Sequence, residues 1–205
     1  MADSTPADFW NQRFSAEPDL YGARPNDWVA RCCGDLSPGS RVLCLAEGQG
    51  RNALWLAARG HRVTAVDASA VAMSQLATAA TSRGLAIDTV TALLPDWSPP
   101  AASFEAVVLI YAHFPPDVRA LIHRQAARAL VPGGLLVLEA FDKAQLGRSS
   151  GGPKDLAMLY DRDTLGDDFA MLQVEALAPH DAVLDEGPGH RGQARILRLR
   201  ARAPD

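Results

Sequence analysis

Between residues 41 and 140 the chain alternates short apolar runs with longer Ala-rich or amphipathic stretches. Short apolar runs bounded by turn residues are typical of buried parallel strands. The pattern predicts strands over 41–46, 62–66, 86–91, 104–111 and 135–140, helices over 51–59, 69–83 and 116–130, and a tight turn at 131–134. Strands that alternate with helices in this way form a parallel sheet covered on both faces.

The pattern changes after residue 141. Residues 145–155 are rich in Gly and Ser and lack periodicity, which predicts a mobile loop, and residues 163–169 suit one helical turn. Two long strands follow over 171–184 and 193–202, with no room for a helix between them, so they form an antiparallel hairpin. The prediction is an α/β, Rossmann-like three-layer sandwich with a seven-stranded mixed sheet and an antiparallel C-terminal hairpin.

The first 40 residues form an arm that precedes the alternating region. Helices are expected over Pro6–Phe14 and Asp27–Asp35. Four aromatic residues lie within this arm, at Phe9, Trp10, Phe14 and Tyr21. They either anchor the arm on the domain or form a lid over a ligand. We expect one domain over 1–205, made of a helical arm or lid (1–40), a βα core (41–140), and the loop with the hairpin (141–205).

Composition narrows the class of protein. The 205 residues are 48% hydrophobic and 21% charged, as in ordinary globular proteins. A net charge of -4 and dispersed arginines give no basic surface for nucleic acid. Three cysteines, two of them adjacent, provide no disulfide framework and favour a reduced, cytoplasmic protein. The polar start of the chain is unlike a signal peptide, and no apolar run approaches the roughly 20 residues of a membrane helix.

A glycine pair follows the first strand, and an acid ends the second. Gly48 and Gly50 belong to a G-x-G-x-x-A sequence, and Asp67 ends the next strand, which is the pattern of a nucleoside-binding βαβ unit. Glu47 directly before the glycines would repel a pyrophosphate. S-adenosylmethionine carries an ammonium, a carboxylate and a ribose without phosphate. Glu47 suits the ammonium, the helix N-terminus near Asn52 suits the carboxylate, and Asp67 suits the ribose hydroxyls.

Several stretches together carry a family resemblance: 42–53, 66–69 and 130–136, with 9–14 and 21–26 in the arm. On these residues the chain resembles small class I S-adenosylmethionine-dependent methyltransferases, within the group of tellurite-resistance and thiopurine methyltransferase-like proteins. The resemblance implies a sheet of order 3-2-1-4-5-7-6 with strand seven antiparallel. The chain departs from the family pattern at Cys44, Ala46 and Leu93, where the family has an acid, a glycine and an acid.

The resemblance also implies a set of site residues. The expected cofactor-binding residues are Trp10, Arg13, Ala46, Glu47, Gly48, Asn52, Asp67, Ala68, Leu93, Leu94 and Ile110. The expected substrate-binding residues are Tyr21, Arg24, Tyr111 and His190. His113, after the fourth strand, is the candidate general base, although methyl transfer needs a base only when the acceptor holds a proton. No metal site is expected, because His190 and Glu186 lack a third ligand nearby.

These inferences predict transfer of a methyl group from S-adenosyl-L-methionine to a small-molecule nucleophile, such as a thiol or a chalcogen oxyanion. The partners expected are this substrate and no nucleic acid or membrane, with the chain a monomer or homodimer. Two alternatives remain open. The G-x-G-x-x-A sequence allows an NAD(P)-binding oxidoreductase, and the departures from the family pattern allow a non-catalytic module that binds S-adenosylmethionine.

Overall fold

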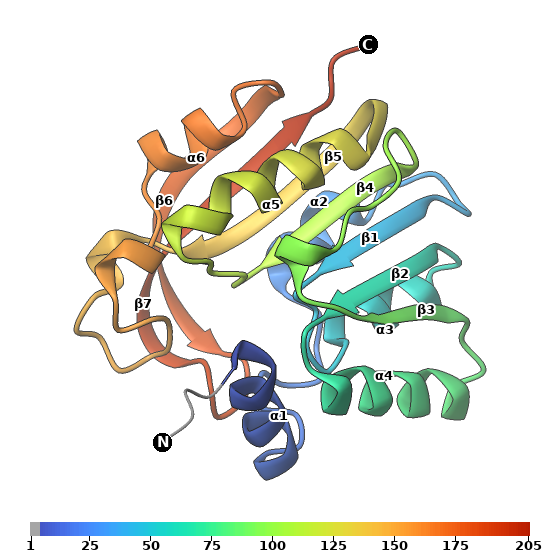
Figure 1. Cartoon of the computed structure of the whole chain (residues 1–205), viewed down its shortest axis with the longest axis horizontal. Helices are drawn as coiled ribbons and strands as arrows, with labels where there is room; N and C mark the ends of the chain where they lie inside the picture. The colour runs from blue at the N-terminus through green and yellow to red at the C-terminus, as the bar shows by residue number, and fades with distance from the viewer. Residues whose placement is uncertain (1–4) are drawn as a thin grey trace.

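The computed structural model describes residues 5–205. Seven strands form one sheet in the order β3-β2-β1-β4-β5-β7-β6 (Figure 1). Strands β1 to β5 run parallel, and β7 runs antiparallel to both of its neighbours, β5 and β6. The strands are β1 (Arg41–Leu45), β2 (Arg62–Asp67), β3 (Ile87–Thr91), β4 (Phe104–Ile110), β5 (Leu130–Phe141), β6 (Gln173–Asp185) and β7 (Arg191–Arg202). The predicted fold class and strand order are confirmed.

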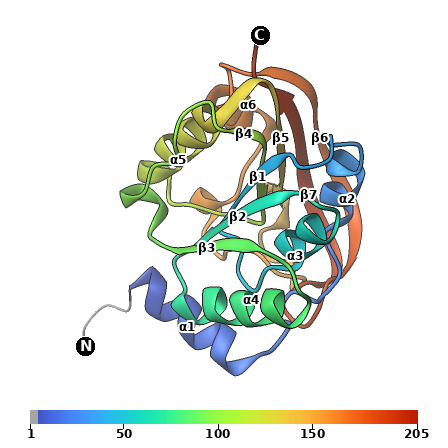
Figure 2. The same ribbon diagram turned by 90° about the vertical axis from the view of Figure 1, so that its right-hand side faces the viewer.

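Helices cover both faces of this sheet (Figure 2). On one face lie α2 (Asp27–Cys33), α3 (Arg51–Ala58) and α4 (Ala70–Ser82), and on the other lie α5 (Pro116–Ala129) and α6 (Arg162–Asp168). Short 3-10 helices occur at η1 (Leu94–Asp96), η2 (Lys143–Gln145) and η3 (Leu156–Met158). Successive side chains of β1 point to opposite faces, so Val42 packs with the α2–α4 layer and Leu43 with the α5–α6 layer.

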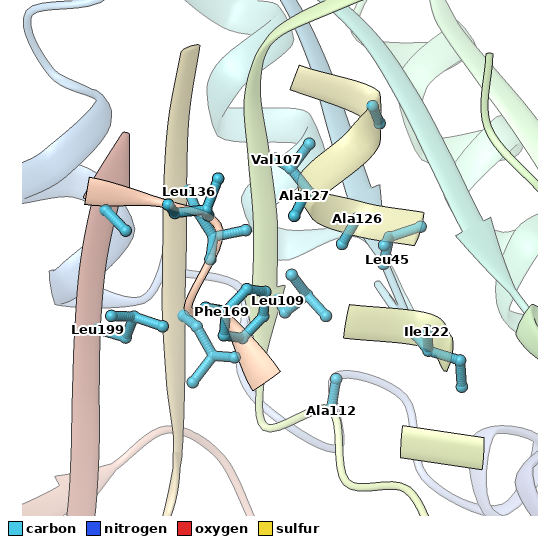
Figure 3. Packing of buried hydrophobic residues seen from close by; sticks show 14 of the residues in the cluster. Leu45, Val107, Leu109, Ala112, Ile122, Ala126, Ala127, Leu136, Phe169 and Leu199 are labelled. Carbon is cyan, nitrogen blue, oxygen red and sulfur yellow. The ribbon is translucent and has the colours of Figure 1, made fainter. Parts of the chain in front are cut away.

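The core on the α5–α6 side explains the apolar run of β4. Figure 3 shows Ile122 and Ala126 of α5 beside Leu109 of β4, with Phe169, which follows α6, packed nearby. Because β4 carries a helical layer on each face, five of its seven side chains are buried in an unbroken run, Ala106 to Ile110. This packing fixes where β4 ends within the sheet, and therefore where the residues that follow Ile110 lie.

Strand β5 begins earlier than the sequence predicts. The expected turn at 131–134 lies within β5, and helix α5 ends directly before it at Ala129. The physical reason is backbone pairing with the segment after β7: Gly133 N–H donates to Ala203 O at 3.1 Å, and Ala203 N–H donates to Gly134 O at 2.9 Å. These bonds extend the sheet through residues that would otherwise form a local turn.

The predicted loop at 145–155 is irregular, but it is fastened to β7. The Gln145 side chain donates to Ser150 Oγ at 2.8 Å and accepts from Arg195 N–H at 2.8 Å. Ser150 Oγ in turn donates to Gln193 O at 2.7 Å, and both side chains are buried. These contacts favour a held segment over the mobile loop that composition alone predicted.

Helix α1 (Pro6–Ala16) lies beside α4 (Figure 1) and contacts the segments that follow β1 and β2. Asn11 Oδ1 accepts from Ser69 Oγ at 2.8 Å and from Val71 N–H at 3.2 Å, which ties α1 to the start of α4. After α1, Gln49 in the glycine turn accepts from Leu20 N–H at 2.9 Å and donates to Glu17 O at 3.2 Å. The arm is therefore held by side chains from both partners, Asn11 of the arm and Gln49 of the glycine turn.

Candidate functional site

The residues that follow β1 and β4 adopt an unusual backbone conformation. Ala46 has φ 50° and Tyr111 has φ 53°, in the left-handed region that side chains other than glycine rarely enter. Such residues persist where the surrounding structure enforces them, and they cluster at functional sites. Both lie at the carboxyl ends of adjacent parallel strands, where α/β folds place their ligands.

The glycine turn after β1 allows the backbone, α1 and α4 to approach closely. Gly48 and Gly50 have φ of 60° and 91°. A Cβ on Gly50 would lie 2.2 Å from Leu76 Cδ1, and one on Gly48 would lie 3.0 Å from Phe14 Cζ. The turn is therefore packed by α4 on one side and covered by the arm on the other.

Asp67 at the end of β2 faces this turn. Its Oδ2 accepts from Gly48 N–H and its Oδ1 from Ser69 N–H, each at 2.8 Å. The side chain is buried, and burial raises the pKa of this carboxyl. Each carboxylate oxygen accepts more than one hydrogen bond. The two oxygens thus retain acceptor capacity for a vicinal diol, which fits the ribose of S-adenosylmethionine.

Glu47 contacts the helix, which corrects one prediction. Its Oε1 accepts from Asn52 N–H at 2.9 Å and from Ala53 N–H at 2.7 Å, so it caps the N-terminus of α3. Those N–H groups were expected to receive the carboxylate of the cofactor, and they are already occupied. Burial raises the pKa of Glu47 to about 7, against the opposing effect of these hydrogen bonds.

The predicted cofactor residues of the arm lie above the glycine turn. Trp10 stacks on Phe14 with ring centroids 5.5 Å apart, and the Arg13 guanidinium lies over the Trp10 ring at 5.8 Å. Asn52 connects the other end of the arm, because its Oδ1 accepts from Asn26 N–H at 2.9 Å. The structure thus brings Trp10, Arg13, Gly48 and Asn52 to one region around the glycine turn.

The remaining predicted cofactor residues follow β2, β3 and β4. Ala68 follows β2 directly, and Ile110 is the last residue of β4. Leu93 is exposed, whereas Leu94 is buried in the core at the start of η1. With no carboxylate at position 93, this part of the site offers apolar side chains and backbone groups.

A cavity of about 210 Å³ lies between the arm and the turn that joins β6 to β7. Its lining is rich in charge and includes Tyr21, Arg24, Arg51, Glu139, Glu186 and Arg198. Two ion pairs organise the wall: Arg51 to Glu186 at 3.0 Å and Arg198 to Glu139 at 2.5 Å. Arg24 forms no ion pair or hydrogen bond with the described part of the chain and remains available at the cavity.

His190 lies in this turn, but it is not exposed at its tip. The residue is 4% exposed, and its ring lies 4.4 Å from that of Tyr21 and 4.3 Å from that of Tyr111. The turn is drawn in by the arm, since Gly189 N–H donates to Leu20 O at 2.8 Å. Tyr21, Tyr111 and His190 are therefore brought together as predicted substrate residues, with Arg24 beside them on the cavity.

His113 has a different environment from the one expected of a general base. Its Nδ1 lies 2.7 Å from Met158 O, and its Nε2 accepts from Phe141 N–H at 3.1 Å. Burial lowers the pKa of this imidazole to about 4. Both nitrogens are engaged by backbone groups, so the geometry gives His113 a structural role and does not favour catalysis.

Sequence reasoning missed the polar residues that join the arm to the strand ends. Asn26 Nδ2 donates to Glu139 Oε1 at 2.6 Å and to Glu186 Oε1 at 3.1 Å. Glu139 carried a usable signal, because a lone carboxylate within the apolar run of β5 must find partners when buried. Asn26 gave no such signal, since an N-cap residue is common on exposed helices as well.

Residues 5–205 contain no cluster of three or more His, Cys, Asp or Glu side chains that could hold a metal ion. Within the same residues, no helix combines the length and apolar character that crossing a membrane requires.

Comparison with known proteins bears on the chemistry of this site. Residues 42–134 match the model of the family described as a methyltransferase domain. A search of curated protein sequences found no match. Many solved structures share the fold.

Three of these structures illustrate the likeness. One comes from a study of how a disulfide bond is converted into a thioacetal group during echinomycin biosynthesis; it is 19% identical with a TM-score of 0.77 and covers 98% of this chain and 93% of its own. TehB from Haemophilus influenzae is 18% identical with a TM-score of 0.73, and the match covers 95% of this chain and 67% of TehB. A SAM-dependent methyltransferase from Methanosarcina mazei is 18% identical with a TM-score of 0.69, and the match covers 84% of this chain and 96% of the other.

The family match and the shared fold together support a class I S-adenosylmethionine-dependent methyltransferase and imply S-adenosyl-L-methionine as its cofactor. The matched residues include the glycine turn, Asp67 and the end of β4, which carry several of the predicted cofactor residues. The predicted enzyme class and cofactor are confirmed at this level. The likeness to solved structures, at below 20% identity, concerns the fold and leaves the methyl acceptor open.

Proposed function

We propose that this protein transfers the methyl group of S-adenosyl-L-methionine to a small molecule bound in the cavity between the arm and the β6–β7 turn. The observation that supports this proposal most directly is the cavity itself. Glu139 lines it and accepts from Tyr111 N–H through its backbone oxygen at 2.7 Å, which puts the cavity near the carboxyl end of the sheet, the end that also carries Asp67. Its volume of about 210 Å³ is below the ≈ 300 Å³ of common drug-sized pockets, which favours a small acceptor.

For the cofactor, we propose that Asp67 accepts both ribose hydroxyls and that Ala46, Gly48 and Ala68 provide the close backbone approach. Leu93, Leu94 and Ile110 would form the apolar surroundings of the adenine, while Trp10 and Arg13 cover the turn from the arm. When bound, the cofactor supplies a methyl group already activated by a sulfonium. The protein then has to orient the acceptor and exclude water.

For the acceptor, we propose a soft nucleophile of the kind handled by the tellurite-resistance and thiopurine methyltransferase-like group: a thiol or a chalcogen oxyanion. Two neighbours support this class, TehB and the protein studied in the conversion of a disulfide bond into a thioacetal group. Arg24 supports an anionic group on the acceptor, since it is a cation without a partner among the described residues. Three free, buried cysteines support a reducing, cytoplasmic location.

Thermal-shift measurements with S-adenosylhomocysteine and with NADP test the cofactor. A ligand that binds only the folded protein stabilises it by about 2.7 kcal/mol at a hundredfold excess over Kd. We expect stabilisation by S-adenosylhomocysteine and none by NADP. The reverse result would support the oxidoreductase alternative instead. Methyl transfer to any member of a panel of thiols, selenite and tellurite would exclude the non-catalytic alternative.

The Asp67 assignment has its own test. Asp67→Asn should weaken S-adenosylhomocysteine binding by about 1.5–3 kcal/mol, because charge-assisted hydrogen bonds to the ribose are lost. Asp88→Asn on β3 is the matched control, since Asp88 is exposed on a neighbouring strand. Calorimetry that finds the same affinity for both variants would show that Asp67 does not contact the ribose.

A further inference from the structure

Two buried polar atoms next to the cavity-lining residues Glu139 and Glu186 have no hydrogen-bond partner among residues 5–205: the Tyr111 hydroxyl oxygen and His190 Nδ1. The rings that carry them are 4.3 Å apart. Buried polar groups in folded proteins are almost always hydrogen-bonded, so each exception requires an explanation. The Tyr111 hydroxyl, held at the strained end of β4, therefore points to a ligand that completes its bonding, whereas His190 Nδ1 faces the carboxylate of Glu186.

Glu186 gives the imidazole of His190 a defined orientation. Its Oε2 lies 3.6 Å from His190 Nδ1 and 3.0 Å from Arg51 Nη2. A carboxylate on the Nδ1 side favours the tautomer with its proton on Nδ1 and leaves the Nε2 lone pair as an acceptor. Nε2 forms no hydrogen bond with the described chain, and unlike Nδ1 it is not fully buried, so it remains accessible. His113 offers no such nitrogen, because backbone groups engage both of its own.

We propose that His190, oriented by Glu186, accepts the proton that the methyl acceptor releases, and that the Tyr111 hydroxyl donates a hydrogen bond to the same acceptor. This inference rests on the proposed methyl transfer and narrows its substrate class. It selects acceptors that still hold a proton at working pH, such as an alkyl thiol, over nucleophiles that are already ionised.

The step balances in atoms and electrons. The acceptor's S–H bond breaks as its new S–CH3 bond forms, and the proton moves to His190 Nε2. The carbon–sulfur bond of the sulfonium breaks with its electron pair on sulfur, which leaves a neutral thioether. His190 then returns the proton to water, so no oxidant or reductant is required.

Charges from every neighbouring element act on this pair. Arg51 of α3 and Glu139 of β5 face His190 together with Glu186, and His113 opposes a second positive charge. Burial lowers the pKa of His190, and burial with the carboxylate of Glu139 raises that of Tyr111 well above its usual value. At neutral pH the imidazole is thus an uncharged acceptor and the phenol remains a donor, as this proton transfer requires.

The kinetic test compares two thiols in the full-length protein: an alkyl thiol, protonated at pH 7, and a nitro-substituted aromatic thiol, ionised at pH 7. His190→Gln should lower kcat for the alkyl thiol by about 10²–10⁴-fold, the usual contribution of a general base. It should lower kcat for the aromatic thiol by less than tenfold, with S-adenosylhomocysteine affinity unchanged. Glu186→Gln should act in the same direction and shift the pH profile. His180→Gln, at an exposed position on β6, is the control.

An equal loss with both thiols would overturn the proposal, since it would show that His190 is merely structural. Nitrogen NMR of the imidazoles in the unmodified protein gives a readout that needs no turnover. We expect the His190 signal to report a proton on Nδ1, and a proton on Nε2 would also overturn the proposal. If the unmodified protein methylates neither thiol nor any other acceptor, the proposed function itself fails, which the NMR result keeps separate.

Discussion

Glu47 stabilises helix α3 through its hydrogen bonds, whereas burial of its ionised carboxylate destabilises the folded protein. Its carboxylate caps α3 through two backbone N–H groups, yet burial raises its pKa from 4.5 to about 7. A carboxyl whose pKa is higher in the folded state favours folding while protonated. Its contribution is therefore fully present below pH 4.5, and it is lost as the pH rises to about 7.

Glu47→Gln should reduce this pH dependence. The amide oxygen can still accept from Asn52 and Ala53, but it does not ionise. Between pH 4.5 and 8 the wild-type free energy of unfolding should fall by about 1–3 kcal/mol more than that of the variant, since one pKa unit corresponds to about 1.4 kcal/mol. Denaturant titrations across this range measure the difference. Glu105→Gln is the control, because Arg41 lowers the pKa of Glu105; parallel curves for Glu47→Gln and wild type would contradict the assignment.

The arm and the β6–β7 turn form the element on which the site depends. A Cβ on Gly187 would lie 2.4 Å from Gly22 N and 2.8 Å from Asp19 O, so the turn and the arm contact backbone to backbone. Gly187 also has φ 79°, which glycine adopts without strain. The same contact positions Glu186 and His190 against Arg51 and Tyr111, so the cavity keeps its shape only while the arm is docked.

Gly187→Ala should separate the arm from the turn. Gly39→Ala is a matched control, because Gly39 has φ 77° but nothing within 4 Å of the added Cβ. The control should lower the free energy of unfolding by about 1–2 kcal/mol through backbone strain. Gly187→Ala should lower it by about 1–3 kcal/mol more because of the clash. Thermal unfolding measures both, and methylation assays should show a further loss of activity for Gly187→Ala alone. Equal stability of the two variants would mean that the arm yields easily at this contact.

At the scale of the whole molecule, the long edge strand β6 decides how copies of the chain can associate. An exposed edge strand pairs readily with another copy unless its backbone or its charges prevent pairing. Pro179 in β6 lacks the N–H that pairing needs, and the strand carries charged side chains, Glu175, Asp181 and Asp185, that pair with arginines of β7. The exposed valines, Val174 and Val183, lie far apart near its ends.

We therefore expect a monomer of 21.9 kDa. Light scattering coupled to gel filtration, at concentrations from micromolar upward, measures this mass directly. A stable dimer would contradict the interpretation of β6. The double variant Asp181→Val with Pro179→Val should associate more as the protein concentration rises. It restores a backbone N–H donor on the edge strand and removes a protective charge.

A feature of the structure could be predicted from the sequence where interactions between neighbouring residues determine it. Apolar runs predicted β1 to β5, because buried parallel strands need continuous apolar residues. The order of the strands was predicted from the family resemblance. The start of β5 could not be predicted, since pairing of Gly133 with Ala203 is a contact between distant segments. At the site, Asp67 was predictable from its place after a strand. Glu47 binding its own helix, and His190 folding inward under Tyr21, depended on tertiary contacts that no local pattern carries.

The contact between the arm and the turn also has a consequence for biosynthesis. Residues 19–22 leave the ribosome early, whereas residues 186–190, against which they pack, emerge long afterwards. During that interval Tyr21 lacks part of its final covering, and the nascent chain has to keep this aromatic surface from other partners. The cavity proposed to bind the acceptor is consequently among the last features to form during translation, so a nascent chain stalled before β7 would carry the glycine turn without this cavity.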